Sequence, residues 1–254
     1  NIIPKNYDLT FNPDLKQFVY SGQEVLTFEL PSAQKEIWLD ALELDIISCK
    51  LLKKGAEESC QTRVKEKKLF ITFPKRLAKE NYQVEIVFSG NITDHLAGWY
   101  KSRYMVDGQM RYIATSQFEP GDARRVFPCV DHPSFKATFA VSFLLTEGLV
   151  GISNMPVMEE KNYEVVEGDR RGNDKEKKLV EFETTPVMST YLLYLGVGEF
   201  EWQEGKYRDV LIRGVTSPGK SEYTKFAIEE TKKYSFKNIV KYLMKKIKRK
   251  KINQ

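Results

Sequence analysis

The sequence has no apolar run that approaches the length needed to cross a bilayer. A membrane-spanning helix takes about 18 or more consecutive, mostly apolar residues, and charged residues make up 30% of this 254-residue chain. Residues 1–5 (NIIPK) also lack the basic and then apolar order of a secretory signal. These absences predict a cytoplasmic protein with no membrane partner.

Cysteine and histidine, the usual metal ligands and nucleophiles, are both scarce. Cys49, Cys60 and Cys129 are an odd number and match no metal-binding spacing, so we predict buried or idle thiols in a reducing cytoplasm. His95 and His132 are far apart, and neither stands in an H-E-x-x-H pattern. A catalytic zinc ion needs three protein ligands and an open position. We therefore expect ordinary loop or surface histidines and no metal site.

The common catalytic motifs are missing as well. The sequence contains no G-x-S-x-G, no P-loop and no G-x-G-x-x-G. A Ser/His/Asp arrangement is not excluded by counting, although no motif marks one. We predict no catalytic residue and no cofactor in this chain.

Acidic residues are missing from the end of the chain. After Glu230 there are ten lysines and arginines and no Asp or Glu, which leaves 30 basic and 35 acidic residues before that point. The net charge of +5 therefore describes a mildly acidic body with a basic tail. Such a tail can hold nucleic acid or acidic lipid, but the simpler interpretation is a solvated end without a dedicated partner, so we expect no nucleic acid.

What the sequence does contain is a succession of short β segments. Residues 69–73 (LFITF) and 82–88 (YQVEIVF) alternate apolar and polar side chains, as half-buried strands do. Further strands are predicted at residues 7–11, 24–30, 36–39, 110–118, 135–145, 179–183, 190–200 and 210–215, with turn residues such as Asp107-Gly108 between them. This pattern predicts an all-β sandwich or saddle.

Helical character begins after Ser217-Pro218-Gly219. Apolar residues then recur at steps of three and four positions, at Phe226, Ile228, Phe236, Ile239, Val240, Leu243 and Ile247. We predict a β-sandwich over residues 1–215 and a short helical, strongly basic segment over residues 216–254.

One connection concentrates unusual residues. Residues 116–139 (SQFEPGDARRVFPCVDHPSFKATF) place charges, aromatic rings and prolines between two predicted strands. A loop of this composition either carries a functional site or holds neighbouring parts of the fold together. Plain salt bridges can hold such a turn, the candidate pairs being Asp122 with Arg124 or Arg125, and Asp131 with Lys136.

The same connection resembles the signature of the first domain of aminopeptidase N-type zinc peptidases (gluzincins), typically Q-F-E-x-x-x-A-R-x-x-F-P-C-x-D-x-P-x-F-K-A-x-F. Four further segments match that family in order: residues 4–9 (PKNYDL), 96–102 (LAGWYKS), 153–156 (SNMP) and 185–200, with its PVMSTYL and VGEF. Five ordered matches are more specific than any single motif. Within the family, the sequence most resembles archaeal members such as the aminopeptidases that work with the tricorn protease. His132, where most relatives have Glu, is a small departure.

The resemblance implies a role for the domain and for two side chains. In the family, the first domain is a saddle-shaped β-sandwich of antiparallel and mixed sheets that caps the active site. The zinc ion and the catalytic groups lie in a second domain, whose H-E-x-x-H and G-x-M-E-N motifs are absent here. We therefore expect a truncated or split enzyme without activity alone. By motif match, Glu119 would bind the free α-ammonium group of a peptide and Gln117 would line the pocket for its first side chain.

A carboxylate suits that role for a physical reason. A partly desolvated carboxylate that accepts a hydrogen bond from a cation gains about 1.5–3 kcal/mol. An internal peptide bond would leave Glu119 unpaired, so the site would select the free N-terminus of a peptide over internal positions. One carboxylate by itself is expected to bind amines weakly.

A second interpretation is a stand-alone interaction module. Without its catalytic domain, the face that meets that domain in the family would be exposed and apolar, which predicts self-association or binding to a separate catalytic chain.

Overall fold

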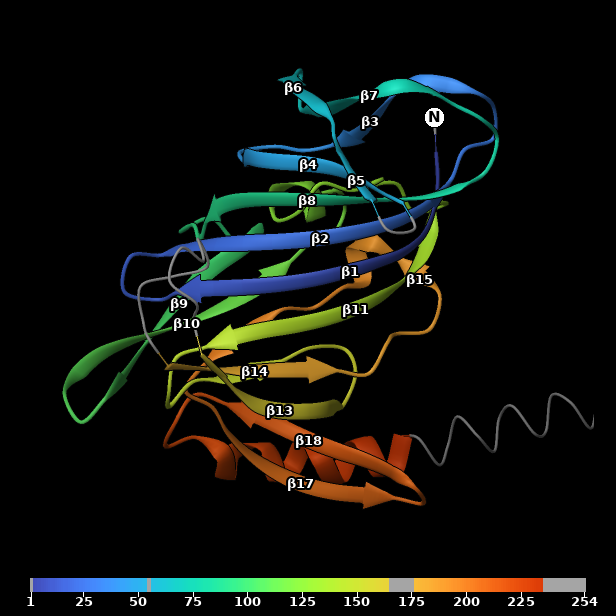
Figure 1. Ribbon diagram of the computed structural model, residues 1–254. Coiled ribbons are helices and arrows are strands. Elements are labelled where there is room, and N and C mark those ends of the chain that lie inside the picture. The colour runs from blue at the N-terminus through green and yellow to red at the C-terminus, as the bar shows by residue number, and fades with distance from the viewer. Residues whose placement is uncertain (1, 54–55, 165–175, 235–254) are drawn as a thin grey trace, which may run out of the picture. The chain divides into compact units, whose positions relative to one another are not determined.

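The computed structural model describes residues 2–53, 56–164 and 176–234 (Figure 1). The chain forms two compact units, of which the first contains Asn1–Arg103 and Tyr112–Gly198 and the second Tyr104–Arg111 and Glu199–Gln254. Residues 199–216 thus group with the helix that follows them, and the boundary between residues 215 and 216 stays a prediction. The predicted apolar stripe from Phe236 to Ile247 lies outside the described residues.

The first unit is built from strands in three sheets. In order across the nine-stranded sheet, these are β13 (Val157–Glu164), β14 (Glu176–Phe182), β11 (Lys136–Leu145), β1 (Ile3–Asp14), β2 (Val19–Glu29), β8 (Asn81–Asn91), β4 (Asp45–Lys53) and β5 (Ala56–Ser59), with β15 (Met188–Ser189) paired to β11. The three-stranded sheet contains β3 (Gln34–Asp40), β7 (Lys68–Leu77) and β6 (Gln61–Lys65). The four-stranded sheet contains β12 (Val150–Ile152), β16 (Gly196–Gly198), β10 (Gln109–Gln117) and β9 (Gly98–Val106), of which the end of β9 and the start of β10 are counted in the second unit.

The nine-stranded sheet is mixed. Strands β1 and β11 run parallel, with Tyr7 opposite Phe139, whereas β1 and β2, and β2 and β8, are antiparallel. Figure 1 shows β1, β2, β8 and β11 as long neighbouring strands at the centre of the sheet. The expected all-β fold with antiparallel and mixed sheets is confirmed.

The core lies between the nine-stranded sheet and the two smaller sheets. Alternate residues of β2 and β8 are buried, as the period of two requires when one face of a sheet is covered. The ring of Trp99 on β9 lies 5.5 Å from that of Phe11 on β1 and 6.2 Å from that of Phe143 on β11. Buried Leu39 and Ile71 bring the three-stranded sheet into the same apolar cluster.

The structure differs from the predicted strands in two ways: one predicted strand is largely replaced by other structure, and one observed strand was not predicted. Residues 190–200 were expected to form one strand, but they form a 3₁₀ helix, η2 (Thr190–Leu192), and then only the short β16. The hydroxyl of Thr190 donates to the carbonyl group of Val130, and the N–H group of Leu193 donates to the carbonyl group of Thr190 at 3.1 Å, which closes a helical turn where a strand was expected. Strand β4 was missed because a bulge between Ile46 and Ser48 breaks its alternation.

The second unit contains a hairpin and a helix. Strands β17 (Glu201–Tyr207) and β18 (Val210–Thr216) pair, and η3 (Ser221–Tyr223) leads into an α-helix over residues 224–234, as expected after residue 219. Ile228 of that helix is buried, and a Cβ atom at Gly205 would lie 2.4 Å from it, so the helix needs a glycine on β17. Among the residues described, no helix has the length and apolar character that crossing a bilayer requires.

One carboxyl group is buried in the core of the first unit. Glu24 has 0% exposure and occupies a core-facing position of β2, opposite Leu9 on β1 and Ile86 on β8. Neither of its oxygen atoms has a hydrogen-bond partner among the described residues. Because burial disfavours the charged form, the pKa of Glu24 is raised well above its usual range.

We predict that Glu24→Leu raises the free energy of unfolding by about 1–3 kcal/mol at pH 7, since a buried polar group without a partner is destabilising. The unfolded chain loses this proton near pH 4.3, while the folded chain retains it to higher pH. The wild type should therefore lose stability relative to Glu24→Gln as the pH rises above about 4.3. Urea unfolding at pH 5 and pH 8 measures this difference, and an equal difference at both values would contradict the assignment.

Candidate functional site

The connection between β10 and β11 contains the residues that the sequence singled out. It joins the four-stranded sheet to the nine-stranded sheet and contains one short regular element, η1 (Ala123–Arg125). Most of the connection is irregular, so its buried backbone groups need partners outside regular secondary structure.

Aromatic side chains anchor the connection to the core. Phe118 and Phe127 are buried, and their rings lie 6.3 Å apart. Phe127 also meets the ring of Tyr7 on β1 edge-on at 5.8 Å, and Tyr7 stacks on Phe139 of β11 at 5.1 Å. Because these rings belong to the main apolar cluster, the connection completes the core instead of lying loosely over it.

Backbone hydrogen bonds tie the connection to the end of β3. The N–H group of Asp40 donates to the carbonyl of Cys129 at 2.7 Å, and the N–H group of Cys129 donates back at 3.0 Å. The N–H group of Leu42 donates to the carbonyl of Arg124 at 2.8 Å. The connection therefore pairs with the end of β3 through backbone hydrogen bonds, as a short length of antiparallel strand would.

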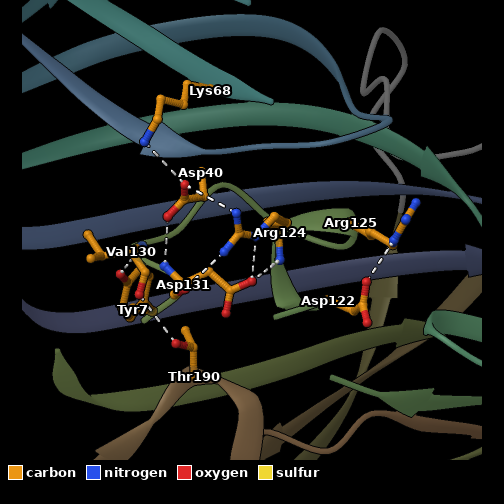
Figure 2. A network of polar contacts seen from close by, with 9 residues as sticks. All are labelled: Tyr7, Asp40, Lys68, Asp122, Arg124, Arg125, Val130, Asp131 and Thr190. Atoms are coloured by element: carbon orange, nitrogen blue, oxygen red, sulfur yellow. Dashed lines mark hydrogen bonds and ion pairs between the residues drawn. The ribbon is translucent and has the colours of Figure 1, made fainter. Parts of the chain in front are cut away.

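An ionic network reinforces this junction, as Figure 2 shows. Arg124 donates from Nε to Asp131 at 2.8 Å and from Nη1 to Asp40 at 3.4 Å. The backbone N–H group of Asp131 donates to the second carboxylate oxygen of Asp40 at 3.1 Å, and Lys68 of β7 lies 3.5 Å from the first. One guanidinium group is thus shared between two carboxylates from segments far apart in the sequence.

Burial and charge act against each other in this network. The side chain of Asp131 is 2% exposed, and burial raises its pKa although the Arg124 guanidinium opposes the shift. Burial also disfavours the charge on Arg124, but its hydrogen bond to Asp131 and the charge of Asp40 outweigh this and raise the pKa of Arg124. The arginine therefore remains charged, which is the condition for holding both acids.

Two tyrosine hydroxyl groups bind the backbone of the same connection. Tyr20 of β2 donates to the carbonyl of Val126 at 2.9 Å. Tyr7 accepts from the N–H group of Val130 at 3.1 Å, and the hydroxyl of Thr190 donates to the carbonyl of Val130 at 3.3 Å. The connection is therefore held from β1, β2 and η2 as well as from β3.

The salt bridges differ in part from the predicted pairs. Asp122 accepts from Arg125 Nε at 2.9 Å, which is one of the expected pairs, and Arg125 also binds Glu43 at 2.6 Å. Asp131 pairs with Arg124 and not with Lys136, because Lys136 is the exposed first residue of β11 whereas Asp131 is turned into the junction.

The two predicted substrate-binding residues lie at the start of the connection. Gln117 is the last residue of β10 and Glu119 follows buried Phe118, and both of their side chains are exposed. No hydrogen bond or ion pair joins either side chain to the other residues that the structure describes. The arrangement leaves one carboxylate and one carboxamide open to a ligand beside a firmly held loop. Their role in binding stays a prediction.

The described residues offer no set of donors for a metal ion. They contain no group of three or more His, Cys, Asp or Glu side chains arranged to hold one. His95 is exposed in a loop, and exposed His132 accepts from the backbone N–H group of Ser134 at 3.2 Å through Nδ1. A zinc ion of the kind that the resemblance implies does not fit the residues described here.

Sequence reasoning missed the residues that hold the site from a distance. Asp40 lies 84 positions from Arg124, and Tyr7 lies 123 positions from Val130. Tyr7 falls within one of the segments that match the family (PKNYDL). That match indicated that the segment is important, but it did not indicate that Tyr7 contacts Val130. Nothing local marks Asp40.

We predict that Arg124→Met lowers the free energy of unfolding by about 2–4 kcal/mol, because it leaves the buried carboxylates of Asp40 and Asp131 without their shared cation. The matched control is Arg63→Met, whose partner Glu36 is exposed and whose loss should cost about 0.5 kcal/mol or less. Chemical denaturation of both variants provides the comparison. Equal losses would show that the network is no more important than a surface pair.

Known proteins match this chain over most of its length. The Peptidase M1 N-terminal domain family matches residues 3–192. "Aminopeptidase 2, mitochondrial" of Saccharomyces cerevisiae is 35% identical over 241 residues, which cover 92% of this chain and 24% of that protein. "Aminopeptidase M1-A" of Oryza sativa subsp. japonica is 36% identical over 234 residues, covering 89% and 25%. "Probable aminopeptidase 2" of Sulfurisphaera tokodaii is 37% identical over 228 residues, covering 89% and 26%.

The chain spans about a quarter of the length of these relatives. The family match begins at the first residue of β1 and ends at the last residue of η2. It therefore includes the whole connection that contains Gln117 and Glu119. This chain is a member of the Peptidase M1 N-terminal domain family.

Proposed function

We propose that this chain is the substrate-capping domain of a zinc aminopeptidase. Glu119 binds the free α-ammonium group of a peptide, and Gln117 lines the pocket for its first side chain. The observation that carries the proposal is the exposure of these two side chains beside a connection whose other charged groups are paired. The three relatives named above are all aminopeptidases, which supports it.

The rigidity of the connection supports a binding role for Glu119. A carboxylate recognises an ammonium group well only when its position is set in advance, because ordering a mobile side chain lowers the affinity. Phe118, directly between the two residues, is buried against Phe127 and so limits the movement of both neighbours. The backbone that carries Glu119 would therefore already be in place when the free end of a peptide arrives, and only the side chain would have to be ordered.

The hydrolytic step belongs to residues other than those described here. The relatives are about four times as long as this chain, and we propose that a catalytic part supplies the zinc ion and the groups that attack the peptide bond. Glu119 and Gln117 are then one half of a shared site, and this chain by itself releases no amino acid.

We propose further that the catalytic part docks on an apolar face next to the connection. Phe135, Val187 and Leu192 are 40%, 65% and 49% exposed. Phe135 lies two residues after Pro133, and Val187 and Leu192 each lie two residues from Ser189 or Thr190, whose side chains bind the carbonyl groups of Pro133 and Val130, so the segments that carry the three residues are close together. Exposed apolar side chains on neighbouring segments are typical of an interaction surface.

The binding role predicts a difference between free and blocked peptides. Titrating the ¹⁵N-labelled chain with a tripeptide that has a free N-terminus should shift backbone signals around residues 117–122, with a dissociation constant in roughly the millimolar range for a single charged contact. The N-acetylated tripeptide should cause no such shift, because it lacks the ammonium group.

Variants make that experiment specific. Glu119→Gln should abolish the shifts, whereas Glu147→Gln, at an exposed carboxylate in a turn elsewhere in the first unit, should leave them unchanged. Equal shifts with the acetylated peptide, or unchanged binding by Glu119→Gln, would refute the assignment of Glu119.

The docking face predicts weak self-association when no catalytic part is present. Sedimentation velocity at increasing concentration should show association that the double variant Val187→Asp, Leu192→Asp reduces at least several-fold. Val64→Asp, on the exposed strand β6, is the control and should behave like the wild type. Association that persists in the double variant would place the contact on another surface.

A further inference from the structure

Two of the three cysteines lie opposite each other at the edge of the nine-stranded sheet. Strand β4 contains Cys49, and Cys60 directly follows the edge strand β5. The register of these strands pairs Lys50 with Ser59, and one further step places Cys49 opposite Cys60. The backbone N–H group of Cys60 donates to the carbonyl of Cys49 at 2.9 Å, which continues the antiparallel ladder to this pair.

This pairing brings the two side chains within bonding range. Directly opposite residues in a hydrogen-bonded antiparallel pair have Cα atoms about 5.5 Å apart, and their side chains point to the same face. Disulfides join Cα atoms that are about 4.4–6.8 Å apart. Cys49 is buried on the core face of β4, and partly buried Cys60 packs against the same core. The two thiols therefore face each other.

We propose that Cys49 and Cys60 are a redox-active thiol pair that low-molecular-weight disulfides, such as oxidised glutathione, convert reversibly into an intramolecular disulfide.

The environments of the two thiols assign them different roles. The Cys60 thiol donates to the carbonyl group of Glu58 at 3.7 Å, and its nearness to Cys49, together with burial, raises the pKa of Cys49. The neighbouring Cys49 thiol lowers the pKa of Cys60, and the backbone of Leu51 adds to the shift although partial burial opposes it. A thiolate is the reactive form of cysteine. Cys60, the more acidic and more accessible thiol, is therefore the attacking group, and Cys49 is the resolving group.

The reaction balances as two thiol–disulfide exchanges. The Cys60 thiolate attacks one sulfur atom of oxidised glutathione, which breaks that disulfide and releases one glutathione thiolate. Cys49 then loses its proton and attacks the Cys60 sulfur of the mixed disulfide, which releases the second glutathione. The protons of the two protein thiols end on the two glutathione molecules. The protein is oxidised by two electrons and the small disulfide is reduced by two.

The resulting bond would fasten a junction between two sheets. Cys60 is the residue between β5, at the edge of the nine-stranded sheet, and β6 of the three-stranded sheet. A disulfide to β4 would hold this edge strand and the start of β6 in place. It would also close a short loop and so restrict the unfolded chain.

The test is an oxidation of the full chain with mass mapping. The reduced protein is incubated with oxidised glutathione, the remaining thiols are alkylated with iodoacetamide, and the intact mass is measured. Once the chain is unfolded for alkylation, we expect a species that has lost two hydrogen atoms and carries a single carbamidomethyl group, on Cys129, whereas the reduced protein carries three. Trypsin cleaves at the lysines between Cys49 and Cys60, so the linkage appears as two joined peptides that dithiothreitol separates.

Variants separate the roles of the three cysteines. Cys49→Ser should stop at a glutathione adduct on Cys60, and Cys60→Ser should remain unmodified. Cys129→Ala is the matched control, since Cys129 is fully buried and its pKa is raised well above the usual value by burial, and it should form the same disulfide as the wild type.

Three results would overturn the proposal. One is a wild-type protein that keeps the glutathione adduct on Cys60 without closing. The others are a linkage that includes Cys129 and the absence of any reaction under conditions that modify the denatured chain. The peptide map of the wild type decides between these outcomes even if a variant fails to fold.

Discussion

The shared guanidinium group of Arg124 is the constraint on which the rest of the site depends. It holds Asp131, in its own connection, and Asp40, at the end of β3, in one arrangement. A buried ion pair adds little net stability, because removing its charges from water is costly, but it strongly disfavours arrangements that leave a charge unpaired. The network therefore selects one conformation of the connection between β10 and β11 among the many that an irregular segment could adopt.

That selection matters because the two exposed side chains of the site have no support of their own. The side chains of Gln117 and Glu119 have no hydrogen bond or ion pair among the described residues, and their position depends on buried Phe118 and on the connection that follows. Burial, aromatic packing and backbone hydrogen bonds all act on the residues after them. The structure thus combines a rigid base with an open polar edge, which is the arrangement that the recognition of a charged ligand requires.

Other polar groups of the first unit lie outside the ionic network around Arg124. Glu24 is buried and has no hydrogen-bond partner in the part of the chain that the structure describes, and its raised pKa keeps a neutral acid in the core. Cys49 and Cys60 lie opposite each other at the sheet edge, where their mutual interaction raises the pKa of Cys49 and lowers that of Cys60. Burial contributes to the raised pKa of both Glu24 and Cys49, but Cys60 is partly exposed and so within reach of molecules in solution.

The sequence alone determined the fold class and the identity of the family, because both depend on information that is local along the chain. Alternation within β7 and β8 shows in a few residues, and the segment from Gln117 to Phe139 can be compared with a family motif without knowing the fold. The same locality explains the errors. The bulge in β4 hid a strand, and a helical turn, η2, begins where a strand over residues 190–200 was predicted.

Only the tertiary structure decided which groups meet. Asp131 had a nearby lysine in the sequence, yet it pairs with Arg124, and that arginine reaches Asp40 across 84 positions. Cys49 and Cys60 looked like unrelated thiols until the register of β4 and β5 placed them face to face. Strand register is set by the burial of whole sheet faces, which is a property of the complete core. No stretch of sequence contains it, so the partners of a charged or reactive side chain emerge only when the sheets are packed.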